Sequence, residues 1–147
     1  MKPIPLFSAL SALVALTGCE SIGAPSDPLT AQPWHLESIE RPSQPPVTLS
    51  GRAQDSHWIR FEEDGRLTAS LDCNRGTGDW YRADGMVAPR GTIQIGEIAS
   101  TRALCPTPSY GEEMAASLPL ASDYMVEDGG RTLLLRTRTA TYRFAAR

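Results

Sequence analysis

The chain has 147 residues, a hydrophobic fraction of 41% and a formal net charge of −3 at pH 7. This length fits one domain with a single hydrophobic core and leaves little room for two. The mild negative charge argues against a nucleic-acid-binding protein, which normally carries a basic balance. The chain has three cysteines, so at least one of them has a role outside an intramolecular disulfide.

The first residues have the features of an export signal. Lys2 supplies a positive charge, and Leu6–Leu16 form an apolar run interrupted only by two serines. A run of this length matches the apolar region of a signal peptide and is shorter than the roughly 18 residues that a membrane span needs. The run leads into Leu16–Cys19, which resembles the lipobox of bacterial lipoproteins. An ordinary secretory signal followed by a chance cysteine is the alternative.

The lipobox resemblance implies that residues 1–18 are a lipoprotein signal peptide and that Cys19 becomes the acylated N-terminus. Glu20 follows it, whereas an aspartate there tends to retain enteric lipoproteins in the inner membrane. We therefore expect a lipid-anchored protein on the periplasmic face of the outer membrane. Residues 19–33 are rich in proline and small polar side chains, which is typical of a flexible tether. The domain is expected to cover residues 34–147.

The rest of the chain has the pattern of short strands separated by turns. Apolar residues alternate with polar ones in several short segments, and Asp-Gly pairs mark tight turns. Three prolines between positions 42 and 46 predict irregular structure up to about Asp55. Gly96 lies where the alternation changes phase, which indicates a β-bulge. The expected strands cover Trp34–Ile39, His57–Glu62, Arg66–Leu71, Asp79–Arg82, Thr92–Ser100, Asp123–Glu127, Thr132–Thr137 and Thr141–Ala145.

One helix is expected after residue 108. Ser109 and Glu112 have the spacing of a capping box, and Tyr110, Met114 and Leu118 form one apolar stripe. The proline that follows ends the helix or kinks it. About eight short strands with one packed helix predict a mainly β (α+β) fold, either a small antiparallel barrel or a strongly coiled sheet.

Two stretches of the chain resemble a known pattern. Residues 72–80 read Asp-Cys-Asn-Arg-Gly-Thr-Gly-Asp-Trp, and residues 101–105 read Thr-Arg-Ala-Leu-Cys. Their order and spacing resemble the META domain family, which includes the heat-shock protein HslJ. The resemblance implies a compact, lipocalin-like barrel packed with a helix, and it implies no reaction. The motif residues are Asn74, Gly78, Trp80 and Thr101, with further matches at Glu112, Leu118, Tyr124, Leu133, Leu135 and Phe144.

Two positions depart from the family pattern. Asp72 stands where glycine is usual, so we expect its backbone to lack the positive φ that glycine allows. Ala103 and Leu104 replace the more typical Met-Ala. Asn74 and Gly78 are expected to flank a polar turn between strands. Of two interpretations, an Asx-type turn in which Gly78 supplies positive φ is favoured over a ligand-contacting loop at a barrel mouth.

With Cys19 acylated, Cys73 and Cys105 remain as a pair in an oxidising compartment. We expect them to form a disulfide, and two separate buried thiols are the alternative. A metal site that uses a cysteine with His35 and His57 lacks the close spacing of zinc ligands. No metal and no cofactor are therefore expected.

Catalytic motifs are absent from the sequence, which has no nucleophile elbow, phosphate loop or dinucleotide fingerprint. The acidic clusters at residues 62–64 and 112–113 fall at a hairpin tip and a helix start, so both are expected to be solvated rather than catalytic. The two histidines lie near no serine or cysteine motif, which gives general-base catalysis little support. We expect no catalytic residues and no enzyme activity.

Arginines and tryptophans offer possible contact residues. A solvated sheet face is the favoured interpretation of the arginines, and contact with lipopolysaccharide or peptidoglycan is the alternative. The tryptophans fit either surface contacts or core filling. The residues concerned are Arg131, Arg136, Arg138 and Arg143, with Trp58 and Trp80.

The sequence thus predicts a non-enzymatic, lipid-anchored envelope protein with a binding or stress-related role in envelope integrity. Besides the membrane, the expected partners are an envelope protein, a wall component or a small apolar ligand at the barrel mouth, and no nucleic acid. The alternative is an inhibitor of a lysozyme or protease that acts through the projecting loop Arg41–Asp55. A scaffold that contacts other envelope proteins is a third hypothesis.

Overall fold

The computed structural model describes residues 26–147. The expected signal peptide, the lipidation site Cys19 and the tether as far as residue 25 lie outside the described residues. Within the described part, no helix is long and apolar enough to cross a membrane.

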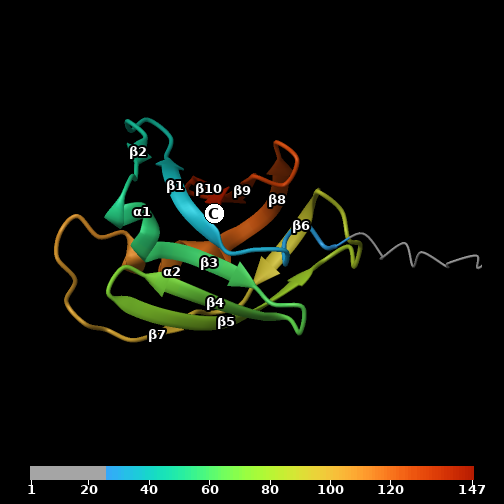
Figure 1. Cartoon of the computed structure of the whole chain (residues 1–147), viewed down its shortest axis with the longest axis horizontal. Helices are drawn as coiled ribbons and strands as arrows, with labels where there is room; N and C mark the ends of the chain where they lie inside the picture. Colours follow the sequence, from blue (N-terminus) through green and yellow to red (C-terminus); the bar gives the residue numbers. More distant parts are fainter. Residues whose placement is uncertain (1–25) are drawn as a thin grey trace, which may run out of the picture.

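Eight antiparallel strands close into a barrel, which confirms the mainly β fold expected from the sequence (Figure 1). The strands follow the order β1, β3, β4, β5, β6, β8, β9 and β10, and β10 pairs back with β1. Two short strands lie beside this barrel, β2 on β1 and β7 on β5. The strands are β1 (Trp34–Glu40), β2 (Val47–Thr48), β3 (His57–Phe61), β4 (Arg66–Leu71), β5 (Asn74–Arg82), β6 (Arg90–Ile95), β7 (Ala99–Ser100), β8 (Ala121–Glu127), β9 (Thr132–Thr137) and β10 (Thr141–Ala146).

Large side chains from all parts of the barrel fill its interior. The bulkiest fully buried ones are Trp34, Phe61, Tyr142 and Phe144, and they join one continuous hydrophobic cluster. Because residues 26–147 contain this single core, they form a unit that can fold on its own. The filled interior also leaves the outer surface as the place to look for a binding site.

A β-bulge explains the imperfect alternation of the first strand. Leu36 pairs with Phe144 and Ser38 with Arg143, so β1 has one extra residue between them. The bulge shifts the side chains by one position, and Ile39 therefore faces the core together with Leu36.

A second bulge interrupts the partner of β5. Trp80 pairs with Ile95 and Thr77 with Ala99, so three residues oppose two. The bulge includes Gly96, where the sequence indicated it. The expected strand 92–100 is consequently divided into β6 and β7, which both pair with the same edge of β5.

The helical segments differ from expectation in two places. The capping box does not form: α2 (Gly111–Ser117) begins after Tyr110, and no side chain caps it. A short 3₁₀ segment, η1 (Leu118–Leu120), then contains the proline that was expected to end the helix or kink it. The segment up to residue 55, expected to be irregular, contains β2 and the short helix α1 (Arg52–Ser56). Its prolines occupy only the exposed tip, so regular structure resumes after them.

The packed part of the chain begins at Asp27, earlier than the expected boundary at Trp34. Leu29 is fully buried, and its carbonyl accepts a hydrogen bond from Trp34 Nε1 at 2.9 Å. Asp27 forms a two-pronged ion pair with Arg82 at the end of β5. Residues 27–33 therefore cover one end of the barrel instead of belonging to the tether.

Candidate functional site

Asn74 is the first residue of β5 and connects this strand to the segment that follows β7. Its Nδ2 donates to the carbonyl of Ala103 at 3.0 Å, and its Oδ1 accepts the N–H of Ala103 at 2.7 Å. Oδ1 also accepts the hydroxyl of Thr101 at 2.9 Å. The expected Asx-type turn is therefore wrong, because the carboxamide binds a segment about 29 residues away in the sequence rather than its own turn.

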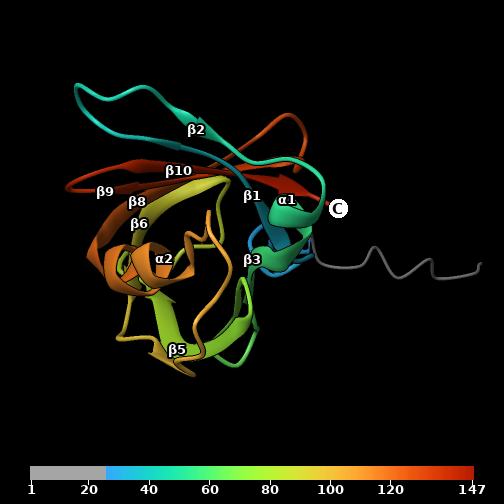
Figure 2. The ribbon, with the colours of Figure 1, turned by 90° about the vertical axis from the view of Figure 1, so that its left-hand side faces the viewer.

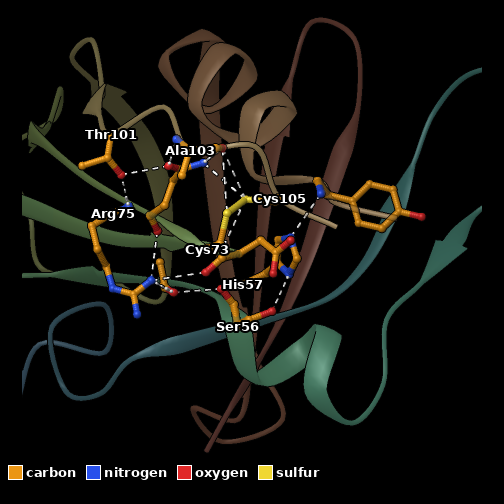
Figure 3. Close-up of a disulfide and its surroundings, with 11 residues drawn as sticks. Ser56, His57, Cys73, Arg75, Thr101, Ala103 and Cys105 are labelled. Carbon is orange, nitrogen blue, oxygen red and sulfur yellow. Dashed lines mark hydrogen bonds between the residues drawn. A yellow bond between two sulfur atoms is a disulfide. The ribbon is translucent and has the colours of Figure 1, made fainter. Parts of the chain in front are cut away.

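A disulfide between Cys73 and Cys105 lies next to this cluster, as the sequence predicted (Figure 3). The two Cα atoms are 5.6 Å apart, and the cysteines are separated by 32 positions. The N–H of Cys73 and Nδ2 of Asn74 both point at Cys105 Sγ, each at 3.3 Å. The segment 101–105 is thus fastened to the start of β5 by a covalent bond and by the Asn74 carboxamide.

The backbone of Asp72 has a φ of 63°, contrary to the expectation that this position lacks a positive φ. The chain must reverse tightly between β4 and β5, and the left-handed conformation produces that reversal. Aspartate tolerates this conformation better than most residues other than glycine. Asp72 therefore adopts a conformation that glycine, the usual family residue here, also favours.

Gly78 is in the middle of β5 and has no positive φ, so the expected role in a turn is wrong. A Cβ at this position would lie 3.0 Å from the carbonyl oxygen of Glu97. At Gly76, a Cβ would lie 2.7 Å from the side chain of Ile98. The two glycines let the bulge at residues 96–98 pack directly on the strand.

Thr101 and Trp80 have separate places in the fold. Thr101 Oγ1 accepts the N–H of Arg75 at 3.0 Å, so it belongs to the Asn74 cluster. Trp80 is buried near the other end of β5, packs edge-on against Phe61, and donates Nε1 to the carbonyl of Glu62 at 3.0 Å. Of the motif residues, the structure brings together Asn74 and Thr101 and leaves Trp80 in the core.

The segment from residue 100 to residue 104 has a free backbone edge. The N–H of Thr101 bonds to the carbonyl of Arg75 at 3.0 Å, and the N–H of Arg75 bonds to the Thr101 hydroxyl instead of its carbonyl. In this segment the groups that bond toward β5 are the N–H of Thr101 and both backbone groups of Ala103, and Ser100, Arg102 and Leu104 alternate with them. Within the described residues, the backbone groups of Arg102 and Leu104 have no hydrogen-bond partner.

A groove of about 350 Å³ lies between this free edge and helix α2. Leu71 and Ile98 contribute apolar surface, and the helix side has the small residues Ala115 and Ala116. Charged residues of opposite sign also line it, Arg102 from the edge segment and Glu112 from the helix, and both are exposed. Figure 2 shows α2 beside the long connection that runs from β7 toward it. In the part of the chain described, neither charge forms an ion pair.

Leu104 is fully exposed, with a relative accessibility of 101%, although its neighbours on both sides are fixed. Ala103 is fixed by the Asn74 carboxamide and Cys105 by the disulfide. Sequence reasoning missed this residue and the edge on which it lies. The one available signal was its departure from the usual family residues before the cysteine.

Both histidines bind backbone atoms. His57 is buried; its Nδ1 lies 2.6 Å from the carbonyl of Ala53, and its Nε2 accepts the N–H of Tyr110 at 3.1 Å. His35 Nδ1 lies 3.3 Å from the carbonyl of Gln54. Among the described residues, no three His, Cys, Asp or Glu side chains are grouped so as to hold a metal ion.

Glu113 is partly shielded and paired, which corrects the expectation that the cluster at residues 112–113 is solvated. Arg41 donates Nε to Glu113 Oε1 at 2.9 Å and Nη2 to Oε2 at 2.5 Å. The hydroxyl of Tyr142 donates to Oε1 at 3.3 Å. Burial of this tyrosine raises its pKa to about 12, and the neighbouring Glu113 carboxylate adds to the shift.

The arginines of the C-terminal hairpin do not form one continuous surface. Arg143 binds Glu37 at 2.9 Å and lies 3.9 Å from Asp128. Arg131, Arg136 and Arg138 are exposed. Trp58 is half-buried on β3. Of these residues, Arg136 lines a separate cavity of about 330 Å³ together with Arg90, and Arg131 and Arg143 do not line it.

A family model of the META domain matches residues 27–147. The chain belongs to the META domain family. The matched region begins at Asp27, where the packed part of the structure also begins. A search of curated proteins finds no match to this chain.

Solved structures share the fold of this META domain. A protein from Burkholderia xenovorans solved by NMR is 16% identical, with 98% of this chain and 99% of that chain covered and a TM-score of 0.57. A DUF4847 family protein from Bacteroides vulgatus is 19% identical, with 80% of this chain and 93% of that chain covered and a TM-score of 0.54. At these identities the likeness concerns the fold alone.

Proposed function

We propose that this protein is a non-enzymatic envelope lipoprotein, acylated at Cys19, whose META domain binds an extended segment of another envelope protein. The lipobox supports the anchor and the location on the periplasmic face of the outer membrane. The free backbone edge of Ser100, Arg102 and Leu104 beside the groove is the observation that carries the binding role.

An extended polypeptide fits this groove because an unpaired strand edge accepts another strand. The added strand gains affinity from main-chain hydrogen bonds and specificity from alternate side chains. Here the edge supplies the backbone groups of Arg102 and Leu104, and the alanines of α2 leave room for the inward side chains. Arg102 and Glu112 favour a segment that has an acidic residue facing the edge and a basic residue facing the helix.

The hydrogen bonds of the polar motif residues also favour a binding role over catalysis. The carboxamide of Asn74 has both of its atoms engaged with Ala103, and Thr101 Oγ1 both donates and accepts. Polar groups that are fully used in the fold are poor candidates for general acid or base work on a substrate. They are well suited to hold the edge rigid before binding, which lowers the entropy cost of association.

The edge is tested by removing one backbone donor. A library of random linear peptides is selected on the domain of residues 26–147, and the affinities of the selected peptides are then measured on two variants. Arg102→Pro deletes an N–H that has no partner in the described structure, whereas Arg102→Ala changes the side chain alone. We expect at least tenfold weaker binding by Arg102→Pro and a change of threefold or less in Arg102→Ala. Equal affinities of the two variants, or no selected peptide, contradict the binding mode.

The anchor is tested separately in the full chain. Radiolabelled palmitate should be incorporated into the parent chain and not into Cys19→Ser, and the variant should leave the membrane fraction. Labelling of the variant, or a parent chain without label, contradicts acylation at this residue.

An inhibitor of a lysozyme or protease remains a second candidate because one projecting loop is ordered. Arg41 and Gln44 close a turn through a hydrogen bond of 3.3 Å, with Pro42 and Ser43 at its centre. Ser43 has a φ of 63°, and the ion pair of Arg41 with Glu113 fixes the base of the loop. Residues 42–46 are all exposed. Inhibition of either enzyme class by the domain, lost on deletion of residues 43–45, would favour this function.

A further inference from the structure

Two apolar side chains are exposed together on the loop between β5 and β6. Met86 and Val87 have relative accessibilities of 63% and 61%. Neighbouring exposed apolar residues on a loop cost solvation and often mark a contact with another molecule or with lipid. Neither residue belongs to the groove beside Asn74.

This loop lies at the barrel end where the described chain begins (Figure 1). A line of contacts joins the two: Arg82 Nη1 donates to Asp27 Oδ2 at 2.6 Å, and Arg82 Nε donates to the hydroxyl of Tyr124 at 2.9 Å. That hydroxyl donates to the carbonyl of Ala88, inside the loop, at 2.8 Å. The Arg82 guanidinium is also held over the rings of Trp80 and Tyr124. The start of the described chain and the apolar loop are therefore fixed beside each other.

Few residues separate this end of the barrel from the proposed anchor. Seven positions lie between Cys19 and Asp27. A fully extended chain spans at most about 3.5 Å per residue, so Asp27 lies within roughly 28 Å of an acylated Cys19. Because this connection is short, the barrel end that carries Met86 and Val87 has a high effective concentration at the lipid surface.

We propose that the β5–β6 loop seats the barrel on the bilayer, with Met86 and Val87 inserted at the boundary between headgroups and acyl chains. The loop has one charged residue, Asp84, whose Oδ1 turns back to accept the N–H of Met86 at 3.1 Å. Arg90 follows the loop and is exposed, in reach of lipid phosphates. The same end also has the acidic turn at residues 62–64, which favours a mainly zwitterionic surface over a strongly anionic one.

This membrane contact of the β5–β6 loop depends on the proposed acylation at Cys19. Depth-dependent fluorescence quenching tests whether the loop inserts. The acylated full chain is reconstituted in vesicles of phosphatidylethanolamine with a minor share of phosphatidylglycerol, with and without brominated acyl chains. Val87→Trp is compared with Leu104→Trp, because Leu104 is also exposed and lies near the opposite end of β5, next to the residue that Asn74 binds. The native tryptophans are common to both variants, and the signal of the parent chain is subtracted.

We expect the added tryptophan at position 87 to be quenched at least twice as strongly as the one at position 104. Adding Met86→Asp to Val87→Trp should return quenching to the level of the control, because a carboxylate opposes insertion. Equal quenching at positions 87 and 104, in a chain that incorporates palmitate, overturns the seat and leaves the anchor intact. Absence of palmitate label contradicts the anchor and the seat together, and the peptide measurements on residues 26–147 remain independent of both.

Discussion

The carboxamide of Asn74 binds both backbone groups of Ala103, as a neighbouring strand would. This single side chain extends the pairing of β5 beyond its backbone and fixes the segment that leads to the disulfide. The free edge on the other side of that segment is therefore rigid, although it belongs to no regular element beyond Ser100.

Replacing Asn74 should destabilise the domain and loosen this edge. We expect Asn74→Ala to lower the free energy of unfolding by about 2–3 kcal/mol, since each neutral hydrogen bond contributes roughly 1 kcal/mol. Urea unfolding of residues 26–147 with the disulfide intact measures the change. Asp79→Asn on the same strand is the matched control, because Asp79 is exposed and its side chain forms no hydrogen bond in the described structure. A loss below about 0.5 kcal/mol would show that the carboxamide contacts are dispensable.

Asp72 offers a test of the reversal between β4 and β5. Its φ of 63° suits glycine, but glycine also gains entropy in the unfolded chain. We expect Asp72→Gly to stay within about 1 kcal/mol of the parent in unfolding free energy. Asp72→Val should lose about 1–2 kcal/mol, because a β-branched residue is strained in this region. Thermal and urea unfolding of the two variants check the difference, and equal stability of Gly and Val would contradict the φ assignment.

The ion pair between Asp27 and Arg82 should make residues 27–33 part of the stable domain. The side chains are only 17% and 8% exposed, so Asp27→Asn leaves a buried guanidinium without its counter-charge. We expect this variant to lose about 3–5 kcal/mol of unfolding free energy. The double variant Asp27→Leu with Arg82→Met should be destabilised less than the single one, since it removes both charges. A single variant as stable as the parent would place the domain boundary after this segment.

Deprotonation of Tyr142 should lower the stability of the domain at alkaline pH. Its pKa is raised by burial to about 12 in the folded state, against 10.0 for a free tyrosine. The resulting stability is fully present below pH 10 and is lost as the pH rises toward 12, with a total of about 2–3 kcal/mol. Unfolding free energies measured between pH 9 and pH 12 should fall in the parent and fall less in Tyr142→Phe. Tyr81→Phe, at the surface, should behave as the parent does, and parallel curves for all three would reject the assignment.

The sequence predicted well those features that depend on local patterns. The hairpin of β3 and β4, the apolar face of Met114 and Leu118, and the bulge at Gly96 all follow from alternation, spacing and turn composition. The disulfide followed from counting the cysteines and from the resemblance of Leu16–Cys19 to a lipobox.

Features that depend on contacts between distant segments were missed. The run Asn-Arg-Gly-Thr-Gly has the composition of a turn, yet it is a strand because residues 97–98 pack against Gly76 and Gly78. The segment 27–33 has the composition of a linker, and only its contact with Arg82, 55 positions away, makes it part of the domain. The backbone edge at residues 100–104 has no sequence signal, because it depends on which hydrogen bonds are already used.

The length of strand β5 separates the groove from the proposed membrane contact. It begins at Asn74, beside the groove, and ends at Arg82, beside the proposed membrane seat. Eight residue steps of about 3.3 Å place these two ends roughly 26 Å apart. Because both ends belong to one continuous strand of the closed barrel, lengthening the tether would leave that distance unchanged. With the β5–β6 loop on the lipid as proposed, a partner would therefore meet the groove near the end of β5 that lies away from the bilayer.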